Sequence, residues 1–373
     1  MPATSPTAVP LKLGLLTPHN PYDRMTFSGT SWFAAQALKD HPEIDLTILG
    51  PHKPRGRFAR LLRQRDAEVD INQLDLAGID AVLGLVATPL LDQLSQRHPS
   101  MPFFHVTDAT PAFLREAYGW AVPHEADVRE TRVAAKAQAT IYTSAPMAAR
   151  APADLGLPGL QPAVIPFGVN LENLPKTCPR KPPLDILRLL FVGIDWERKG
   201  GDVALAVLDR LNEAGYSSEL TVVGRCPAKH RGHPGLIDAG FLNKSRQSDR
   251  VKLANLYRQA HFLLLPSRGD CTPMVVAEAM AHGTPVLATD TGGVGSQIGG
   301  GGAGRTLPLM APPSEWTQAI FEMTANKEAY AWSSDTAFDR CRAVFSWKSW
   351  ASAMNSELRG WLTKDHEDQR RIA

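Results

Sequence analysis

Short apolar runs alternate with amphipathic stretches along most of the chain. Runs of this kind fit the strands of a parallel sheet whose two faces are both covered by helices. In the first half they predict strands at Lys12–Leu16, Asp45–Leu49, Ala81–Val86, Phe103–Val106, Thr140–Thr143 and Ala163–Ile165. The first half therefore reads as one doubly wound α/β domain.

The alternation stops between residues 171 and 186, where prolines and charged residues replace the apolar runs. We interpret this stretch as leading into a second domain through a linker. The pattern then resumes, with strands expected at Leu187–Val192, Leu220–Val223, Phe262–Leu265 and Val286–Thr289, and helices at Asp202–Ala214, Asp249–Ala260 and Met274–Ala281. We predict two Rossmann-like domains, 1–170 and 171–345, followed by a helix over 346–373. Ligands of such domains bind beyond the carboxyl ends of the strands, so we expect the site in a cleft where the two domains face each other.

Composition narrows the class of protein. A chain of 373 residues suits two α/β domains, and 43% hydrophobic with 21% charged residues is ordinary for a soluble protein. The net charge of +2 creates no field that would favour nucleic acid. The four cysteines form no CxxC pair. With no signal peptide and no apolar run near 18 residues, we expect a cytoplasmic protein.

The segment 266–293 carries the most distinctive chemistry. A loop with Arg268 and Asp270 follows a buried strand, and a helix begins near Pro273, since proline suits the first turn. Asp270 and Glu278 bracket this turn, and carboxylates accept hydrogen bonds from sugar and ribose hydroxyls. Free backbone amides at a helix start bind anions. The candidates for this are Pro273, Met274 and Val275.

A second segment, 191–202, runs from a strand through a glycine turn into a helix. Gly200 and Gly201 allow the backbone to approach a ligand closely. Arg198 and Lys199 would neutralise a bound anion there. The alternative is an exposed basic pair at a helix start, which the helix dipole disfavours.

These segments resemble the signature of retaining glycosyltransferase family four, the group 1 glycosyltransferases with the GT-B fold. Residues 278–286 read Glu-Ala-Met-Ala-His-Gly-Thr-Pro-Val, and Lys199-Gly200 matches the family's Lys-Gly. The resemblance implies a metal-independent enzyme, without a cofactor, that moves a sugar from a nucleotide-sugar donor to an acceptor hydroxyl with retention. A non-catalytic nucleotide-sugar binder, or another sugar-nucleotide enzyme such as an epimerase, stays an alternative.

The resemblance also implies roles for residues of the second domain. Glu278 would bind the ribose hydroxyls, and the backbone after Pro273 would hold the diphosphate together with Arg198 and Lys199. Asp270, which stands where the family has Glu, would orient the donor sugar. Backbone groups near the nucleobase would come from the loops at Gly224 and Phe241.

In the first domain, the family has a glycine-containing loop that closes over the diphosphate, and Gly29 and Thr30 are the candidates here. The alternative is a plain strand-to-helix connection with Ser28 as the N-cap. Asp108 follows the strand at 103–106, and we expect it to contact the donor sugar or the acceptor. His105, inside that strand, reads as a core histidine. The C-terminal helix would cross back onto the first domain, as in the family.

Two further features bear on partners. His230 and His233 are too few to make a convincing metal site, so we expect no metal. Residues 52–65 hold six Lys/Arg around an apolar helical face, and a basic amphipathic helix of this kind can make peripheral contact with anionic lipid at the inner face of a membrane. The alternatives are a helix that covers the sheet with a solvated basic rim, or an anionic soluble acceptor. The acceptor is expected to be a glycan, a lipid or a small molecule.

Overall fold

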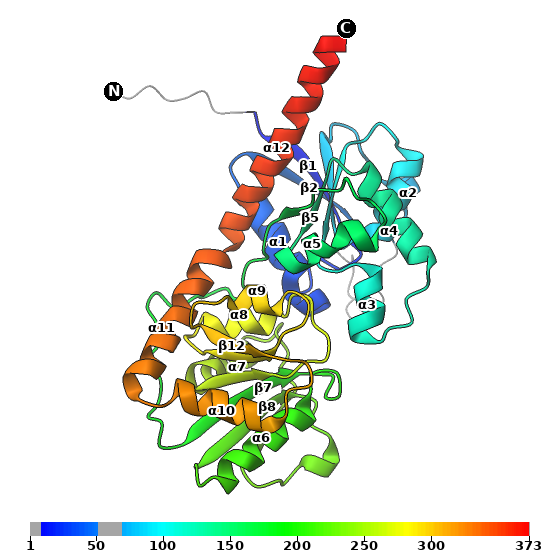
Figure 1. Ribbon diagram of the computed structural model, residues 1–373. Helices are drawn as coiled ribbons and strands as arrows, with labels where there is room; N and C mark the ends of the chain where they lie inside the picture. Colours follow the sequence, from blue (N-terminus) through cyan, green and yellow to red (C-terminus); the bar gives the residue numbers. More distant parts are fainter. Residues whose placement is uncertain (1–8, 51–68, 373) are drawn as a thin grey trace, which may run out of the picture. The chain divides into compact units, whose positions relative to one another are not determined.

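In the computed structural model the chain forms two compact units (Figure 1). The structure describes residues 9–50 and 69–372. The first unit comprises Met1–Ala112, Val122–Gly168 and Trp347–Ala373, and the second comprises Phe113–Ala121 and Val169–Ser346. The short segment 113–121 thus belongs to the second unit, although its chain neighbours on both sides belong to the first.

The first unit is built on a parallel sheet of order β2-β1-β3-β4-β5-β6. Its strands are β1 (Leu11–Leu16), β2 (Ile44–Gly50), β3 (Ala81–Leu85), β4 (Phe103–Thr107), β5 (Ala139–Tyr142) and β6 (Ala163–Val164). Every residue of β3, β4 and β5 is buried, because helices cover both faces. The helices of this part of the chain are α1 (Thr30–Lys39), α2 (Thr88–Arg97), α3 (Pro111–Tyr118), α4 (Glu125–Lys136) and α5 (Ala145–Asp154).

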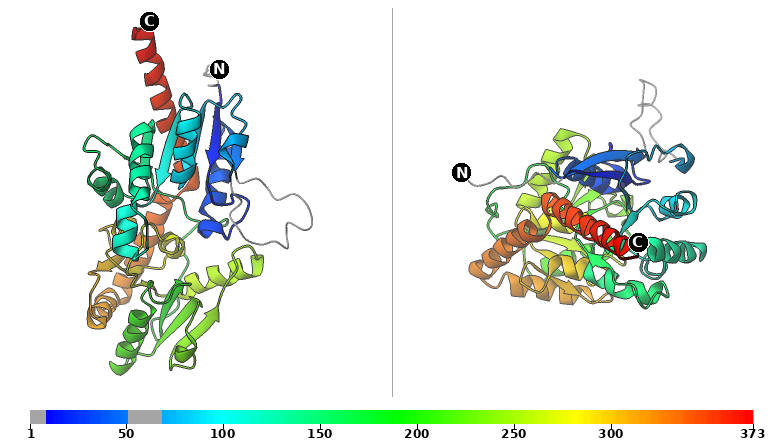
Figure 2. Two further views of the ribbon diagram at one scale, coloured as in Figure 1. Left: turned by 90° about the vertical axis from the view of Figure 1, so that its right-hand side faces the viewer. Right: turned by 90° about the horizontal axis from the view of Figure 1, so that it is seen from above.

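The C-terminal helix α12 (Trp347–Ile372) belongs to the first unit and is one long continuous helix (Figure 2). At its start the Trp347 ring stacks on Phe33 and Phe167, with ring centroids 6.4 and 5.7 Å apart. Farther along, Asn355 Nδ2 donates to Glu43 Oε2 at 2.7 Å. The predicted return of this helix to the first domain is therefore correct.

The second unit is built on another parallel sheet, of order β12-β11-β10-β7-β8-β9. Its strands are β7 (Leu187–Gly193), β8 (Ser218–Gly224), β9 (Leu236–Gly240), β10 (Phe262–Leu265), β11 (Val286–Thr289) and β12 (Gly304–Leu307). Its helices are α6 (Gly201–Glu213), α7 (Gln247–Gln259), α8 (Met274–Met280), α9 (Val294–Ile298), α10 (Pro313–Met323) and α11 (Lys327–Val344). Separate apolar clusters fill the two faces of the sheet. The prediction of a two-domain, doubly wound α/β fold is confirmed.

Candidate functional site

Two loops of the second unit meet at the carboxyl edge of its sheet. Strands β7 and β10 are parallel neighbours, so the loops that follow them leave the sheet at the same edge. The Arg268 N–H donates to the Arg198 carbonyl at 2.8 Å, which joins the loops directly. Gly200 has a φ of +73°, and a Cβ there would lie 2.0 Å from the Pro266 carbonyl oxygen. Position 200 therefore requires glycine because the two loops approach each other closely there. The sequence had suggested the close approach of a ligand as the reason.

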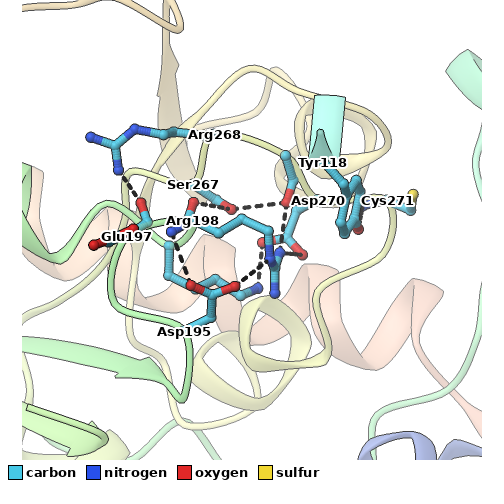
Figure 3. A network of polar contacts seen from close by, with 10 residues as sticks. Tyr118, Asp195, Glu197, Arg198, Ser267, Arg268, Asp270 and Cys271 are labelled. Carbon is cyan, nitrogen blue, oxygen red and sulfur yellow. Dashed lines mark hydrogen bonds and ion pairs between the residues drawn. The ribbon is translucent and has the colours of Figure 1, made fainter. Parts of the chain in front are cut away.

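The loop contact brings the predicted charged residues together (Figure 3). Lys199 Nζ lies 2.5 Å from Asp270 Oδ2, and Arg198 Nη1 lies 3.8 Å from Asp270 Oδ1. The side chains of Arg198, Lys199 and Asp270 are only 20%, 13% and 7% exposed. The alternative of an exposed basic pair is therefore wrong: two cations converge on one buried carboxylate.

Arg198 is fixed by several further contacts. Its Nη1 donates to the Gly269 carbonyl at 2.8 Å, and its Nε donates to Asp195 Oδ2 at 3.1 Å. Its guanidinium carbon lies 4.9 Å from the centre of the Tyr118 ring. Arg268, in the same loop as Asp270, donates to the Glu197 carbonyl (Figure 3). Its guanidinium also pairs with the Asp202 carboxylate, at 2.8 Å. The two arginines thus have separate surroundings, and only Arg198 reaches Asp270.

Glu278 lies in α8 and is fully buried. Lys244 Nζ donates to its Oε1 at 2.5 Å, and the Tyr257 hydroxyl donates to its Oε2 at 2.9 Å. Burial, and then the negative charge of Glu278, raise the pKa of Tyr257, so the phenol keeps the proton that it donates. Both carboxylate oxygens are thus engaged inside the protein, by two residues that no sequence motif singled out. Of these two partners Lys244 is the one that reaches solvent, with a side chain that is 23% exposed, whereas Tyr257 is fully buried.

The other predicted residues of the second unit lie at the same edge of the sheet. Pro273 is the N-cap residue of the seven-residue helix α8 and is followed by the buried Met274 and the half-buried Val275. Gly224 ends β8 with a φ of +124°, and a Cβ there would lie 1.9 Å from the Gly193 carbonyl oxygen. Phe241, which follows β9, is 55% exposed.

The predicted residues of the first unit share the carboxyl edge of their own sheet. Gly29 is the N-cap residue of α1 with a φ of +89°, and Thr30 is its buried first residue. Phe27 and Ser28 also have positive φ angles, +48° and +57°, which side-chain-bearing residues rarely adopt. Such strain concentrates at functional sites. Because the N-cap residue is Gly29 and not Ser28, the alternative of a side-chain N-cap is wrong. Asp108 follows β4 at this edge.

The three histidines considered from the sequence each contact other residues of the fold. His105 is fully buried in β4, as expected of a core histidine, and burial lowers its pKa against the opposing charge of Glu130. His230 stacks on Trp196 with ring centroids 5.2 Å apart, and His233 Nε2 lies 3.2 Å from Asp209 Oδ1. Within residues 9–50 and 69–372, no three His, Cys, Asp or Glu side chains are grouped as a metal site would need.

The proposed membrane face cannot be placed on the fold, because the stretch 52–65 lies outside the described residues. No helix in the described part of the chain combines the length and the apolar character needed to cross a bilayer.

Part of the second unit matches a known protein family. Residues 187–326 match the family described as "Glycosyl transferases group 1". These residues form a group 1 glycosyltransferase domain. Its matched span contains Arg198, Lys199, Asp270 and Glu278, together with both loops of the charged cluster.

Relatives that are named glycosyltransferases match part of the chain. The chain is 30% identical to the D-inositol 3-phosphate glycosyltransferase of Corynebacterium jeikeium over 122 residues, which are 33% of this chain and 29% of that protein. It is 30% identical to the protein of the same name from Nocardiopsis dassonvillei over 183 residues, 44% of this chain and 42% of that protein. The chain thus matches less than half of the length of these relatives.

The fold likeness extends over nearly the whole chain. Sucrose-phosphate synthase of Thermosynechococcus elongatus superimposes with a TM-score of 0.71 at 18% identity, covering 95% of this chain and all of that one. HepE of Anabaena, solved in complex with UDP, superimposes with a TM-score of 0.64 at 13% identity, covering 94% of this chain and all of that one. Both units therefore share the two-domain GT-B fold of these proteins.

Proposed function

We propose that this protein is a retaining glycosyltransferase that moves a sugar from a nucleotide-sugar donor to an acceptor hydroxyl. One observation carries the proposal: Arg198 and Lys199 converge on Asp270 at the carboxyl edge of the sheet in a group 1 glycosyltransferase domain. The two cations would neutralise the donor diphosphate, whose negative charge increases as it leaves. Asp270 would accept hydrogen bonds from the donor sugar, and Glu278 from the ribose once Lys244 has moved away.

In the proposed reaction, the bond between the anomeric carbon and the phosphate oxygen breaks, and a bond from that carbon to the acceptor oxygen forms on the same face. The acceptor proton passes to the leaving phosphate, so no strong protein base is needed. Lys199 would exchange its contact with Asp270 for one with a phosphate oxygen. Because the side chains of Arg198 and Lys199 supply the positive charge, we propose that the transfer needs no metal. A glycan or lipid hydroxyl is the proposed acceptor.

A thermal-shift panel of the purified protein against UDP-, GDP- and ADP-sugars and their free diphosphates tests the proposal. A ligand that binds only the folded state raises the melting temperature. We expect one nucleotide and its sugar to stabilise the protein, and the complex of HepE with UDP is the reason to begin with UDP. No response to any nucleotide would refute the proposal. Binding without turnover of any acceptor would favour the non-catalytic binder instead.

A further inference from the structure

Segment 113–121 packs against the loops that carry the charged cluster. A Cβ at Gly269 would lie 2.2 Å from the Ala117 carbonyl oxygen, so the segment approaches the Asp270 loop as closely as glycine permits. A Cβ at Gly292 would lie 3.0 Å from the tip of the Phe113 ring. The segment is therefore part of the wall of this site, although 70 or more residues separate it from both loops along the chain.

Tyr118, in this segment, contacts both halves of the charged cluster (Figure 3). Its hydroxyl accepts a hydrogen bond of 2.9 Å from the N–H of Cys271, the residue after Asp270. Its ring supports the Arg198 guanidinium at 4.9 Å, within the range of a cation–π interaction. One side chain thus fixes the loop that carries the carboxylate and the cation that faces it.

Two other aromatic side chains pack against the Tyr118 ring. Trp120 packs against Tyr118 with ring centroids 4.8 Å apart, and Phe113 meets it edge-on at 6.2 Å. Tyr118 is therefore held on two sides and has little freedom to leave Arg198. A preorganised cation stabilises developing charge better than one that must reorient, because no reorganisation is needed during the reaction.

We propose that Tyr118 is a positioning residue of the donor site: it holds Arg198 and the Asp270 loop in the arrangement that receives the diphosphate and the sugar. The inference rests on the proposed function. It extends the site to a residue outside both sequence motifs and outside the matched family span of 187–326. Tyr118 acts through Arg198 and the Cys271 amide and need not touch the substrate itself.

Three variants separate the two contacts. Tyr118→Phe keeps the ring under Arg198 and removes the acceptor of the Cys271 N–H, whereas Tyr118→Leu removes both contacts. Tyr216→Leu is the matched control, since Tyr216 is 46% exposed and stacks on Phe321, away from the cluster. The probe is the nucleotide sugar that stabilises the wild-type protein in the thermal-shift panel. Its affinity is measured by calorimetric titration of each folded variant.

We expect Tyr118→Leu to weaken donor binding about tenfold and Tyr118→Phe about threefold, with Tyr216→Leu unchanged, from the usual size of cation–π and hydrogen-bond contributions. In an Arg198→Ala background, Tyr118→Leu should weaken binding by only about threefold more, because the contact with Arg198 is already lost and only the hydrogen bond from the Cys271 N–H is left to remove. A merely structural role would give equal losses in both backgrounds.

The outcomes separate the two proposals. A wild-type protein that binds no nucleotide sugar overturns the proposed function. A wild-type protein that binds, with both Tyr118 variants of equal or higher affinity, overturns the role of Tyr118 alone. Unliganded melting temperatures identify a variant that fails to fold, and Tyr118→Phe, which keeps the ring packing, then decides the question.

Discussion

Replacing Lys244 with methionine would leave the Glu278 carboxylate buried without its cation. Glu278 is fully buried, and Lys244 Nζ is 2.5 Å from its Oε1. Removing one partner of a buried ion pair costs about 3–5 kcal/mol. Because the Lys244 side chain is 23% exposed, solvent screens the pair and the lower end, about 3 kcal/mol, applies. At about 2–4 °C per kcal/mol for a unit of 150–250 residues, the melting temperature should fall by roughly 6–12 °C.

Calorimetric scans of the unliganded protein measure this change. Lys252→Met is the matched control, because Lys252 is an exposed lysine on the neighbouring helix α7, and it should change stability by less than about 0.5 kcal/mol. Adding Glu278→Gln to Lys244→Met should restore most of the loss, since the neutral amide needs no cation and still accepts from the Tyr257 hydroxyl. The reasoning would be refuted if Lys244→Met had the melting temperature of the wild type. It would also be refuted if the double variant were no more stable than the Lys244→Met single variant.

Two further predictions concern the stability of the second unit. Burial lowers the pKa of His261 from 6.5 to about 4. Between these two pH values the unfolded chain binds a proton on this residue that the folded protein does not bind. Stability should therefore fall by up to about 3 kcal/mol between pH 6.5 and pH 4, and His261→Asn should flatten that slope in acid melting scans. At Gly200, alanine would meet the Pro266 carbonyl oxygen at 2.0 Å, whereas at Gly215, with a similar φ of +85°, it would meet nothing within 4 Å. In urea unfolding, Gly215→Ala should cost about 1 kcal/mol and Gly200→Ala at least twice that, and equal costs would contradict the proposed loop contact.

Much of the fold was predictable because the central strands are buried on both faces and therefore read as continuous apolar runs. Phe262–Leu265 and Val286–Thr289 were predicted with their observed bounds. The edge strands β9 and β12 were missed. Most of their residues are half-buried or exposed, so Leu236–Gly240 reads as a loop, and Gly304–Leu307 follows a glycine run that breaks any pattern.

The candidate site was predictable where its residues follow strands in recognisable segments. Arg198, Lys199 and Asp270 meet because β7 and β10 are parallel neighbours. The partners of Glu278 and Arg198 were not predictable, because Lys244, Tyr257 and Tyr118 come from segments without any motif. Their contacts depend on packing between segments distant along the chain, which periodicity does not encode. The roles of Asp108, Gly29 and Thr30, and a cleft between the domains, stay predictions.

The most direct test of the central claim is a calorimetric titration of wild type, Lys199→Met and Arg268→Met with the nucleoside diphosphate that stabilises the wild-type protein. Lys199 faces Asp270, whereas Arg268 is paired with Asp202, so the two variants remove the same charge at different places. We predict that Lys199→Met weakens binding by about tenfold or more and that Arg268→Met changes it by less than about threefold. Equal affinities of wild type and Lys199→Met, or a larger loss in Arg268→Met, would contradict the assignment of the diphosphate to the cluster of Arg198, Lys199 and Asp270.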